Sequence, residues 1–410
     1  MRYDEFSDKQ LIASMWWMLP KYRDYDAIIC DGSIRSGKTV SMTVGFILWA
    51  MTAFNGQRFA ICGKTIESLR RNVTMPLQQE WLAGVCSMRE KPAENLLIVT
   101  MKGRVNYFYL FGGRDESSYQ LIQGITLAGA LLDEVVLMPR SFVEQAMARC
   151  SVAGSRFWFN CNPGAPSHWF YKEWIQQARQ KNALHLHFTM EDNASLDDRI
   201  KQRYSQLYTG VFFDRYILGL WRVAEGRVYD MFTREKHMAP TAERSYVEYW
   251  MSMDYGTLNP TAALLMGRAT DGKWYAVREY YYSGRETGRQ KTDEEYYSDL
   301  DAFVGGLPIR GIIIDPSAAS MIACIRRHGK YHLRAADNSV LDGIRETATA
   351  LNSGNLLICD SCTRTLEEFE SYVWDTKAQE DRPVKSNDHA MDALRYFVKT
   401  VMRRPTVRVY

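Results

Sequence analysis

Residues 32–39 have the spacing of a phosphate-binding loop. They match the pattern G-x-x-x-x-G-K-[ST] with the segment Gly32-Ser33-Ile34-Arg35-Ser36-Gly37-Lys38-Thr39. In such a loop, glycines let backbone N–H groups turn toward phosphates, while the lysine reaches the β and γ phosphates of a nucleotide. The hydroxyl of Thr39 would hold Mg²⁺. The pattern therefore predicts a site for ATP and Mg²⁺.

A nucleotide site also needs a second, acidic element. The apolar run 127–132 ends in the adjacent carboxylates Asp133 and Glu134. A strand buried on both faces has this composition, and open α/β sheets bind ligands at the carboxyl ends of their strands. Asp133 would support Mg²⁺, and Glu134 would orient the attacking water. We interpret the run as a Walker B strand.

A third polar position follows another predicted strand. Residues 152–160 are typical of a strand, and the segment Cys161-Asn162-Pro163-Gly164 comes directly after it. Asn162 would then lie at the same sheet edge and contact the γ phosphate. The segment is equally typical of a plain Asn-Pro-Gly turn, and the pattern alone leaves both interpretations open.

The elements around these residues predict an α/β fold, and the chain length predicts two domains. Residues 27–30 are typical of a buried strand and residues 40–54 of a helix, which is the context that a phosphate loop requires. A chain of 410 residues is too long for one ordinary core. We expect a P-loop NTPase domain with a mainly parallel sheet over 1–220, a connector over 221–246 and a second domain over 247–410.

The second domain begins with strands and ends with a helix. Residues 249–254, 261–267 and 273–282 are typical of three consecutive strands, and residues 289–304 of a helix. A buried strand follows over 311–315, then a helix from Ser317 and a final helix over 387–402.

This order resembles the ribonuclease-H-like nuclease fold, which gathers carboxylates from its first strand, fourth strand and last helix. The resemblance selects Asp254, Asp315 and Asp392 as ligands of two Mg²⁺ or Mn²⁺ ions. Two ions about 3.5–4 Å apart need hard oxygen ligands to stabilise the attacking and leaving oxygens of a phosphodiester. His389 would be a further ligand or would position water or the leaving group. Each aspartate alone is ordinary, and only their joint order is informative.

Together these motifs resemble the terminase large subunit family of tailed bacteriophages across nearly the whole chain. Arg35 lies inside the loop, as is usual in that family. Residues 159–170 resemble its coupling motif, and residues 219–229 resemble its interdomain signature. The pairing of His389 with Asp392 is similar to the nuclease site of the subgroup from phages of Gram-positive bacteria.

The resemblance implies a packaging motor joined to an endonuclease. Such a protein hydrolyses ATP to move double-stranded viral DNA through the portal protein into the procapsid, and it cuts concatemeric DNA. Its implied partners are the DNA, the portal protein and a small terminase subunit. The subunits would form a ring homo-oligomer on the portal, and a monomer in isolation is consistent with this assembly. The implied location is the host cytoplasm, with no membrane association.

The resemblance leaves two roles unassigned, the arginine finger and the contact with adenine. Many relatives have an arginine finger where this chain has Gln123, so the finger is unassigned, and Arg114 is a candidate in an exposed turn. Gln10 stands where many such ATPases contact adenine, but an N-terminal polar residue needs no function. Both assignments stay open.

Charge and cysteine content decide less. The net charge of +3 neither requires nor excludes nucleic acid. A basic stretch after Asp392 is either a solvated tail or a phosphate contact, and it contains Arg395, Lys399, Arg403, Arg404 and Arg408. The eight cysteines favour reduced thiols. A structural zinc is disfavoured because one CxxC is weak evidence, and its candidate ligands would be Cys324, His328, Cys359 and Cys362.

Overall fold

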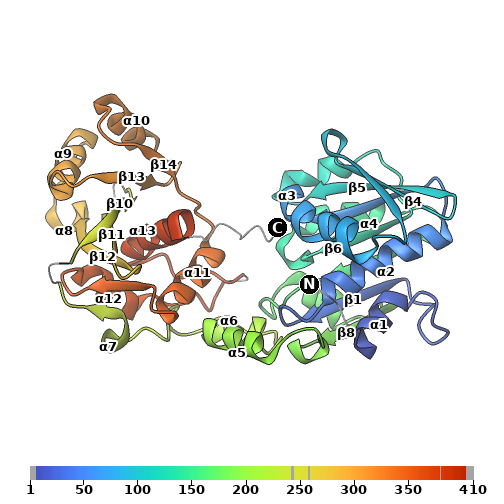
Figure 1. Cartoon of the computed structure of the whole chain (residues 1–410). Coiled ribbons are helices and arrows are strands. Elements are labelled where there is room, and N and C mark those ends of the chain that lie inside the picture. The colour runs from blue at the N-terminus through green and yellow to red at the C-terminus, as the bar shows by residue number, and fades with distance from the viewer. Residues whose placement is uncertain (1–5, 242–243, 257–258, 379, 403–410) are drawn as a thin grey trace. The chain divides into compact units, whose positions relative to one another are not determined.

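The computed structural model describes residues 6–241, 244–256, 259–378 and 380–402, which form two compact units (Figure 1). The N-terminal unit comprises the residues up to Ser205 together with Val211–Val223. The C-terminal unit comprises Gln206–Gly210 and the residues from Ala224 onward. The chain therefore passes between the units over 206–223, which begins earlier than the connector predicted over 221–246. The helix α5 (Asp198–Leu207) ends in this segment, and the helix α6 (Gly210–Tyr216) lies within it.

The N-terminal unit is built on an eight-stranded sheet with the order β3-β4-β5-β2-β6-β7-β1-β8. The strands from β5 to β8 in that order run parallel, and β3 and β4 extend the sheet as an antiparallel edge. The mainly parallel sheet is thus confirmed. The strands are β1 (Ala27–Gly32), β2 (Arg58–Gly63), β3 (Ser87–Lys91), β4 (Leu96–Met101), β5 (Arg104–Gly112), β6 (Gly129–Asp133), β7 (Arg156–Asn160) and β8 (Ala183–Phe188).

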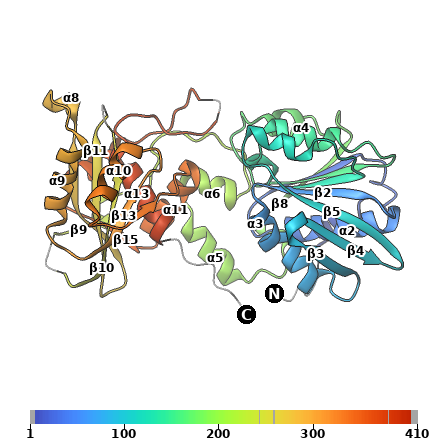
Figure 2. The same cartoon turned by 90° about the horizontal axis from the view of Figure 1, so that it is seen from above.

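Helices cover both faces of this sheet because its central strands are buried on both sides. Ile28 and Cys30 of β1 pack toward α2 (Lys38–Ala53), whereas Ala27 and Ile29 belong to the core cluster of the other face. That second cluster includes residues of α4 (Arg140–Ala148), which lies across the sheet from α2 (Figure 2). The unit also contains α1 (Asp8–Met15) and the single turn α3 (Ile66–Leu69).

The C-terminal unit has a seven-stranded sheet with the order β14-β13-β10-β11-β12-β15-β9. The strands β10, β11 and β12 form an antiparallel meander, and β13 runs parallel to β10. All four strands predicted from the sequence are confirmed. The strands are β9 (Met238–Ala239), β10 (Tyr246–Asp254), β11 (Thr261–Ala269), β12 (Trp274–Tyr282), β13 (Ile309–Ile314), β14 (Leu333–Ala335) and β15 (Leu356–Cys359).

Two helix groups complete this unit. A core cluster joins Met251 and Met253 of β10 to residues of α9 (Asp293–Val304) and α10 (Ala319–His328). The helix α13 (His389–Phe397) packs against β10 and β11, beside α11 (Val340–Asn352) and α12 (Thr363–Ser371). The unit also contains the short helices α7 (Arg234–His237) and α8 (Gly284–Thr287). The segment predicted as a connector contains α7 and β9, and β9 pairs with β15.

Trp158 belongs to an aromatic cluster on the α2 side of the N-terminal core. It is fully buried, and its ring contacts Trp16, Phe46 and Trp49 with centroid distances of 4.6–5.1 Å. We predict that Trp158→Ala lowers the free energy of unfolding by about 3–5 kcal/mol, the usual cost of such a cavity. Denaturant unfolding of the full chain measures this. Leu121→Ala, at a 59% exposed side chain, is the control and should change little.

Candidate active sites

The phosphate loop joins β1 to α2 in backbone conformations that require glycine. Gly37 has φ 86° and caps α2, and an added Cβ would lie 2.0 Å from Gln10 Nε2. Gly32 has φ 125°, and a Cβ there would lie 1.9 Å from the carbonyl oxygen of Phe188. Arg35 is also left-handed, with φ 58°, although it is not glycine. Its side chain donates to the Tyr204 hydroxyl at 2.9 Å.

The Lys38 ammonium group lies buried inside this loop. Nζ donates to the carbonyl oxygens of Gly32 and Ser33 and, at 3.2 Å, to Ser36 Oγ. A fourth bond, also 3.2 Å long, goes to Asn162 Oδ1. Burial lowers the pKa of Lys38, although the nearby carboxylate of Glu134 opposes that shift. The loop thus holds a desolvated cation among oxygen atoms, where an anionic ligand would be favoured.

Asp133 and Thr39 meet at the carboxyl end of β6. Thr39 Oγ1 donates to Asp133 Oδ1 at 3.4 Å. Asn160, at the end of the neighbouring strand β7, donates from Nδ2 to Asp133 and to Thr39 Oγ1. Burial raises the pKa of Asp133, and the hydrogen bonds from Asn160 and Thr39 counter it. The hydroxyl oxygen of Thr39 and the carboxylate oxygens of Asp133 are of the kind that Mg²⁺ prefers.

Asn162 links the two halves of the site. Its Nδ2 donates to both carboxylate oxygens of Glu134, at 3.0 and 3.2 Å, while its Oδ1 accepts from Lys38. Glu134 has φ 61°, a left-handed conformation that turns its side chain off the end of β6. The structure therefore gives Asn162 defined contacts to Lys38 and Glu134, and its contact with a γ phosphate stays a prediction.

These residues line a cavity of about 520 Å³, a size typical of small-molecule sites. Its wall contains the loop residues 34–39, Asp133, Glu134 and Asn162, together with Arg71 and Glu80 from the segment after β2. Gln10 is not among the lining residues. Its Nε2 donates to the Ser36 carbonyl oxygen and its Oε1 accepts from the Ser7 N–H, so it braces the loop, and its contact with adenine stays a prediction.

A second polar network, which the sequence did not reveal, lies under the loop. Asp31 at the end of β1 is buried and accepts from His185 Nε2 at 2.8 Å and His187 Nδ1 at 3.1 Å. Trp221 Nε1 donates to its other oxygen at 2.8 Å. Burial alone would raise the pKa of Asp31, but these partners outweigh it and hold the pKa well below its usual range. The register of β1 with β8 places both histidines beside Asp31.

The carboxylates of the C-terminal unit occupy adjacent strand ends. Asp254 ends β10, and Asp315 directly follows β13, the parallel neighbour of β10. Asp315 accepts from the Ser317 N–H at 2.8 Å and from Asn338 Nδ2 at 3.0 Å. Although burial opposes it, these bonds lower the pKa of Asp315. The fold therefore brings two of the three predicted aspartates to one edge.

The helix α13 supplies the other two predicted residues. His389 Nδ1 lies 2.8 Å from Asp254 Oδ2. Burial raises the pKa of Asp254, while burial of His389 is outweighed by Asp254, which raises the pKa of the imidazole. Asp392 lies within electrostatic reach of Asp254 and accepts from Arg395 Nη2 at 2.8 Å. All four predicted residues thus belong to one neighbourhood.

Tyr396 and Asp388 join this group without having been predicted as ligands. The Tyr396 hydroxyl donates to Asp315 at 3.3 Å, and burial together with the charges of Asp254 and Asp392 raises its pKa. Asp388 Oδ2 is buried without a hydrogen-bond partner among the described residues, and Lys385 Nζ lies 3.5 Å away. Such a set of hard oxygen atoms fits Mg²⁺ or Mn²⁺.

The basic stretch after Asp392 is not a solvated face where it is described. Arg395 and Lys399 are 2% and 5% exposed and pair with Asp392 and Glu346. Arg403, Arg404 and Arg408 lie outside the described residues. Of the arginine-finger positions, Arg114 and Gln123 are both exposed.

The four zinc candidates do not converge. Cys324 and His328 lie on α10, which packs with α9. Cys359 and Cys362 lie at the end of β15, four strands away from β13 in the sheet order. Cys362 Sγ bonds instead to the Ala276 carbonyl oxygen of β12. A Cys₃His site from these residues is therefore excluded by the fold.

The fold and the two sites define a class of protein in which a P-loop NTPase domain and a ribonuclease-H-like domain share one chain. The family model for the N-terminal part of the T4likevirus-type terminase large subunit matches residues 29–236. The chain belongs to the terminase large subunit family.

Solved structures of one relative match almost the entire chain. The large terminase of a thermophilic bacteriophage is 53% identical, with a TM-score of 0.94, over 97% of this chain and 100% of that one. Structures of the same relative in complex with ADP and with ATP-γ-S are 52% and 51% identical, with TM-scores of 0.91 and 0.90 and the same coverage. No curated protein matches. Among the described helices, none has the length and apolar character needed to cross a bilayer.

The buried Asp31 network gives a prediction about acid stability. Because the folded pKa of Asp31 is depressed, its contribution is present above its ordinary value of about 4 and is lost as the pH falls through the folded pKa. We expect Asp31→Asn to cost on the order of 2–3 kcal/mol at pH 7. The variant should also lose less stability than wild type on acidification below about pH 4.

Denaturant unfolding at several pH values measures both effects. Asp24→Asn, at a 91% exposed side chain in the same unit, is the matched control. Equal stability of Asp31→Asn and Asp24→Asn at pH 7 would contradict the role assigned to the network.

Proposed function

We propose that this chain hydrolyses ATP to translocate double-stranded viral DNA through the portal into the procapsid, and that it cleaves concatemeric DNA with a two-metal endonuclease. The observation that carries the proposal is the placement of Lys38, Asn162 and Glu134 in one hydrogen-bonded chain, beside the Thr39–Asp133 pair. The ADP and ATP-γ-S complexes of the thermophilic-phage relative support nucleotide as the ligand.

The residues of the N-terminal cavity divide the work of hydrolysis. Lys38 exchanges its loop carbonyl partners for β and γ phosphate oxygens, which satisfy a buried cation better than neutral carbonyls do. Glu134 accepts a proton from the attacking water or orients it. Asn162 contacts both residues, so a shift of Lys38 on binding of the γ phosphate would be transmitted through Asn162 to the base Glu134. Arg35 and the loop N–H groups complete the phosphate contacts.

Thr39 and Asp133 are the residues that would hold Mg²⁺ in this cavity. The ion supplies charge neutralisation at the β and γ phosphate oxygens. Burial of Asp133 disfavours its free carboxylate, and this cost is offset when a cation binds there. The Asn160 amide keeps the carboxylate and the Thr39 hydroxyl together.

Glu134→Gln tests the hydrolytic assignment. We expect the turnover number for ATP to fall by about 10²–10⁴, the range for loss of a general base, while nucleotide affinity changes little because the loop is intact. A phosphate-release assay and a nucleotide-binding titration measure the two quantities. Glu144→Gln on α4, at a 51% exposed side chain, is the matched control. Persistent hydrolysis in Glu134→Gln would refute the assignment.

Asp254, Asp315 and Asp392 would hold two Mg²⁺ or Mn²⁺ ions in the C-terminal unit. The ions would stabilise the attacking and leaving oxygens at a phosphodiester. The three carboxylates come from two neighbouring strand ends and from α13, so they can approach a pair of ions from different sides. His389 keeps its Nδ1 on Asp254 and is thereby fixed to move a proton or to orient water from its other nitrogen.

Asp254→Asn tests the nuclease separately from the motor. We expect cleavage of plasmid DNA in Mg²⁺ or Mn²⁺ to be lost, because the substitution removes the central carboxylate and leaves an amide that binds a divalent ion weakly. ATP hydrolysis should be unchanged. Gel analysis of nicked and linear plasmid measures cleavage, with Asp342→Asn at a 53% exposed position of α11 as control. Wild-type cleavage by Asp254→Asn would overturn the assignment.

The partners of this activity follow from the proposed function. They are double-stranded DNA, the portal protein and a small terminase subunit, in the host cytoplasm. Copies of the chain would form a ring on the portal, and a monomer in isolation is consistent with this assembly. Arg114 remains the candidate for an arginine acting on a neighbouring copy, because its side chain is exposed in the turn that follows β5. The subgroup from phages of Gram-positive bacteria stays a prediction.

A further inference from the structure

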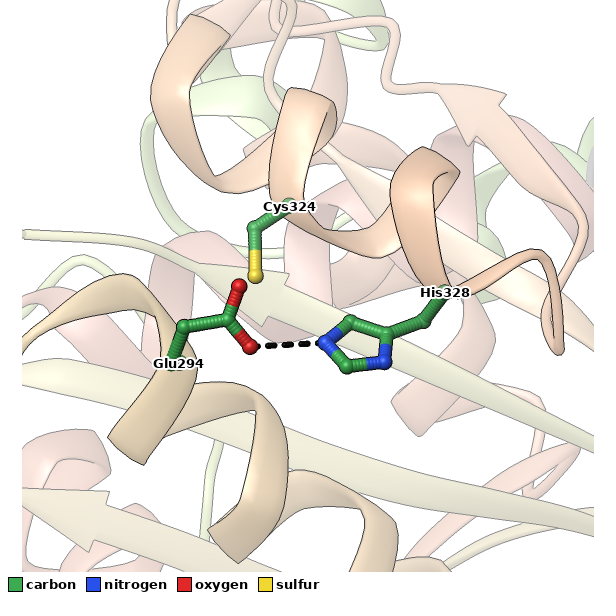
Figure 3. Close-up of side chains that lie close together, drawn as sticks. All are labelled: Glu294, Cys324 and His328. Atoms are coloured by element: carbon green, nitrogen blue, oxygen red, sulfur yellow. Dashed lines mark hydrogen bonds and ion pairs between the residues drawn. The ribbon is translucent and has the colours of Figure 1, made fainter.

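Three side chains of types that can ligate a metal meet between α9 and α10, on the face of the C-terminal sheet opposite α13. Cys324 and His328 are four residues apart on α10, so they project from the same side of that helix. Glu294 projects from the first turn of α9 (Figure 3). One ligand atom from each residue lies within 4.8 Å of the other two. Among the described residues, no other three His, Cys, Asp or Glu side chains bring their ligand atoms this close together.

The imidazole of His328 is already oriented toward this point. Its ring stacks on Tyr297 with a centroid distance of 3.7 Å and an interplanar angle of 5°. This contact fixes the ring plane and aims Nε2 at Glu294 Oε2, 2.7 Å away. A ligand that is held in place by packing loses little entropy when it binds a metal.

Cys324 provides the atom that distinguishes this cluster from a surface ion pair. Its side chain is fully buried in the core cluster of α9 and α10, yet its thiol bonds to the Glu294 carboxylate. Glu294 therefore contacts the sulfur with one end and the imidazole with the other. Figure 3 shows the three functional groups pointing into one small space.

We propose that Glu294, Cys324 and His328 form a zinc site that fastens α9 to α10. Zinc takes cysteine sulfur, histidine nitrogen and carboxylate oxygen in four-coordinate sites, and water would supply the fourth ligand on the exposed side. On binding, the Cys324 thiol releases its proton to solvent and sulfur binds as the thiolate. Mg²⁺ and Mn²⁺, which prefer oxygen ligands, would not select a site that contains sulfur.

The guanidinium group of Arg327 must move away from Glu294 when the metal binds. Arg327 Nη1 lies 2.9 Å from Glu294 Oε1 and competes for that carboxylate. Its side chain is 68% exposed, so it can turn into solvent at small cost. The competitor is therefore weak, and Arg327→Ala removes it without removing a ligand.

The site would fix an element next to the nuclease carboxylates. Asp293, beside Glu294, accepts a hydrogen bond from the Tyr255 hydroxyl, and Tyr255 directly follows Asp254. A metal that holds the first turn of α9 would therefore hold the partner of Tyr255 as well. We expect zinc to raise the unfolding temperature of the C-terminal unit, whether or not that unit cleaves DNA.

Cobalt binding to the full chain tests the site. Co²⁺ replaces zinc and gives a thiolate-to-metal charge-transfer band that carboxylate ligands do not produce, so the nuclease residues are silent in this measurement. We expect one band-forming equivalent in wild type, displaced by Zn²⁺. The band should be lost in Cys324→Ser. His328→Gln and Glu294→Gln change exposed side chains outside the core and should weaken binding by more than about tenfold.

The controls separate this site from the other thiols and from the nuclease. Cys362→Ser and Arg327→Ala should keep the band, and Asp254→Asn should keep it while losing cleavage. The absence of a band in wild type, its survival in Cys324→Ser, or its loss in Cys362→Ser would each overturn the proposal. None of these outcomes bears on whether Asp254 belongs to the nuclease.

Discussion

The N-terminal site depends on the burial of one positive charge. Lys38 is 6% exposed, and its ammonium group has only oxygen atoms of the loop and of Asn162 as hydrogen-bond partners among the described residues. A buried ammonium group is costly unless every proton is bonded, so the loop must curl tightly around it. That curl requires the left-handed backbone at Gly37, and Gln10 fills the space that a side chain there would need. The Asp31 network below then fixes the strand from which the loop begins.

The C-terminal site depends on a buried carboxylate that is not itself a predicted ligand. Glu368 of α12 accepts the N–H groups of Ala390 and Met391, at 2.8 and 3.0 Å, in the first turn of α13. Burial raises the pKa of Glu368 to about 7, although these bonds and the Tyr281 hydroxyl counter the shift. The carboxylate satisfies N–H groups that a helix leaves unpaired, and so it sets where α13 begins. That position determines the contact of His389 with Asp254.

Local patterns are enough to place the predicted site residues at strand ends, but they do not reveal the residues that hold them in position. The loop 32–39, the Asp133–Glu134 pair and Asp254 each end or follow a strand that its own composition reveals. Asp31 and Glu368 are different, because their partners are more than 20 residues away and depend on strand register or helix packing. The strand β9 is hidden for the same reason, since it has two residues and is defined only by its pairing with β15. Burial of Arg395 and Lys399 is likewise hidden, because charge alone predicts exposure.

Both sites bring polar side chains together at the ends of parallel neighbouring strands. Parallel neighbours β6 and β7 bring Asp133 to Asn160, and parallel neighbours β10 and β13 bring Asp254 to Asp315. In the C-terminal pair, hydrogen bonds lower the pKa of Asp315, whereas burial raises the pKa of Asp254. Asp315 is therefore stable as an anion without help, while Asp254 gains most from a nearby positive charge. His389 supplies one when its imidazole is protonated, and a divalent ion would supply a larger one.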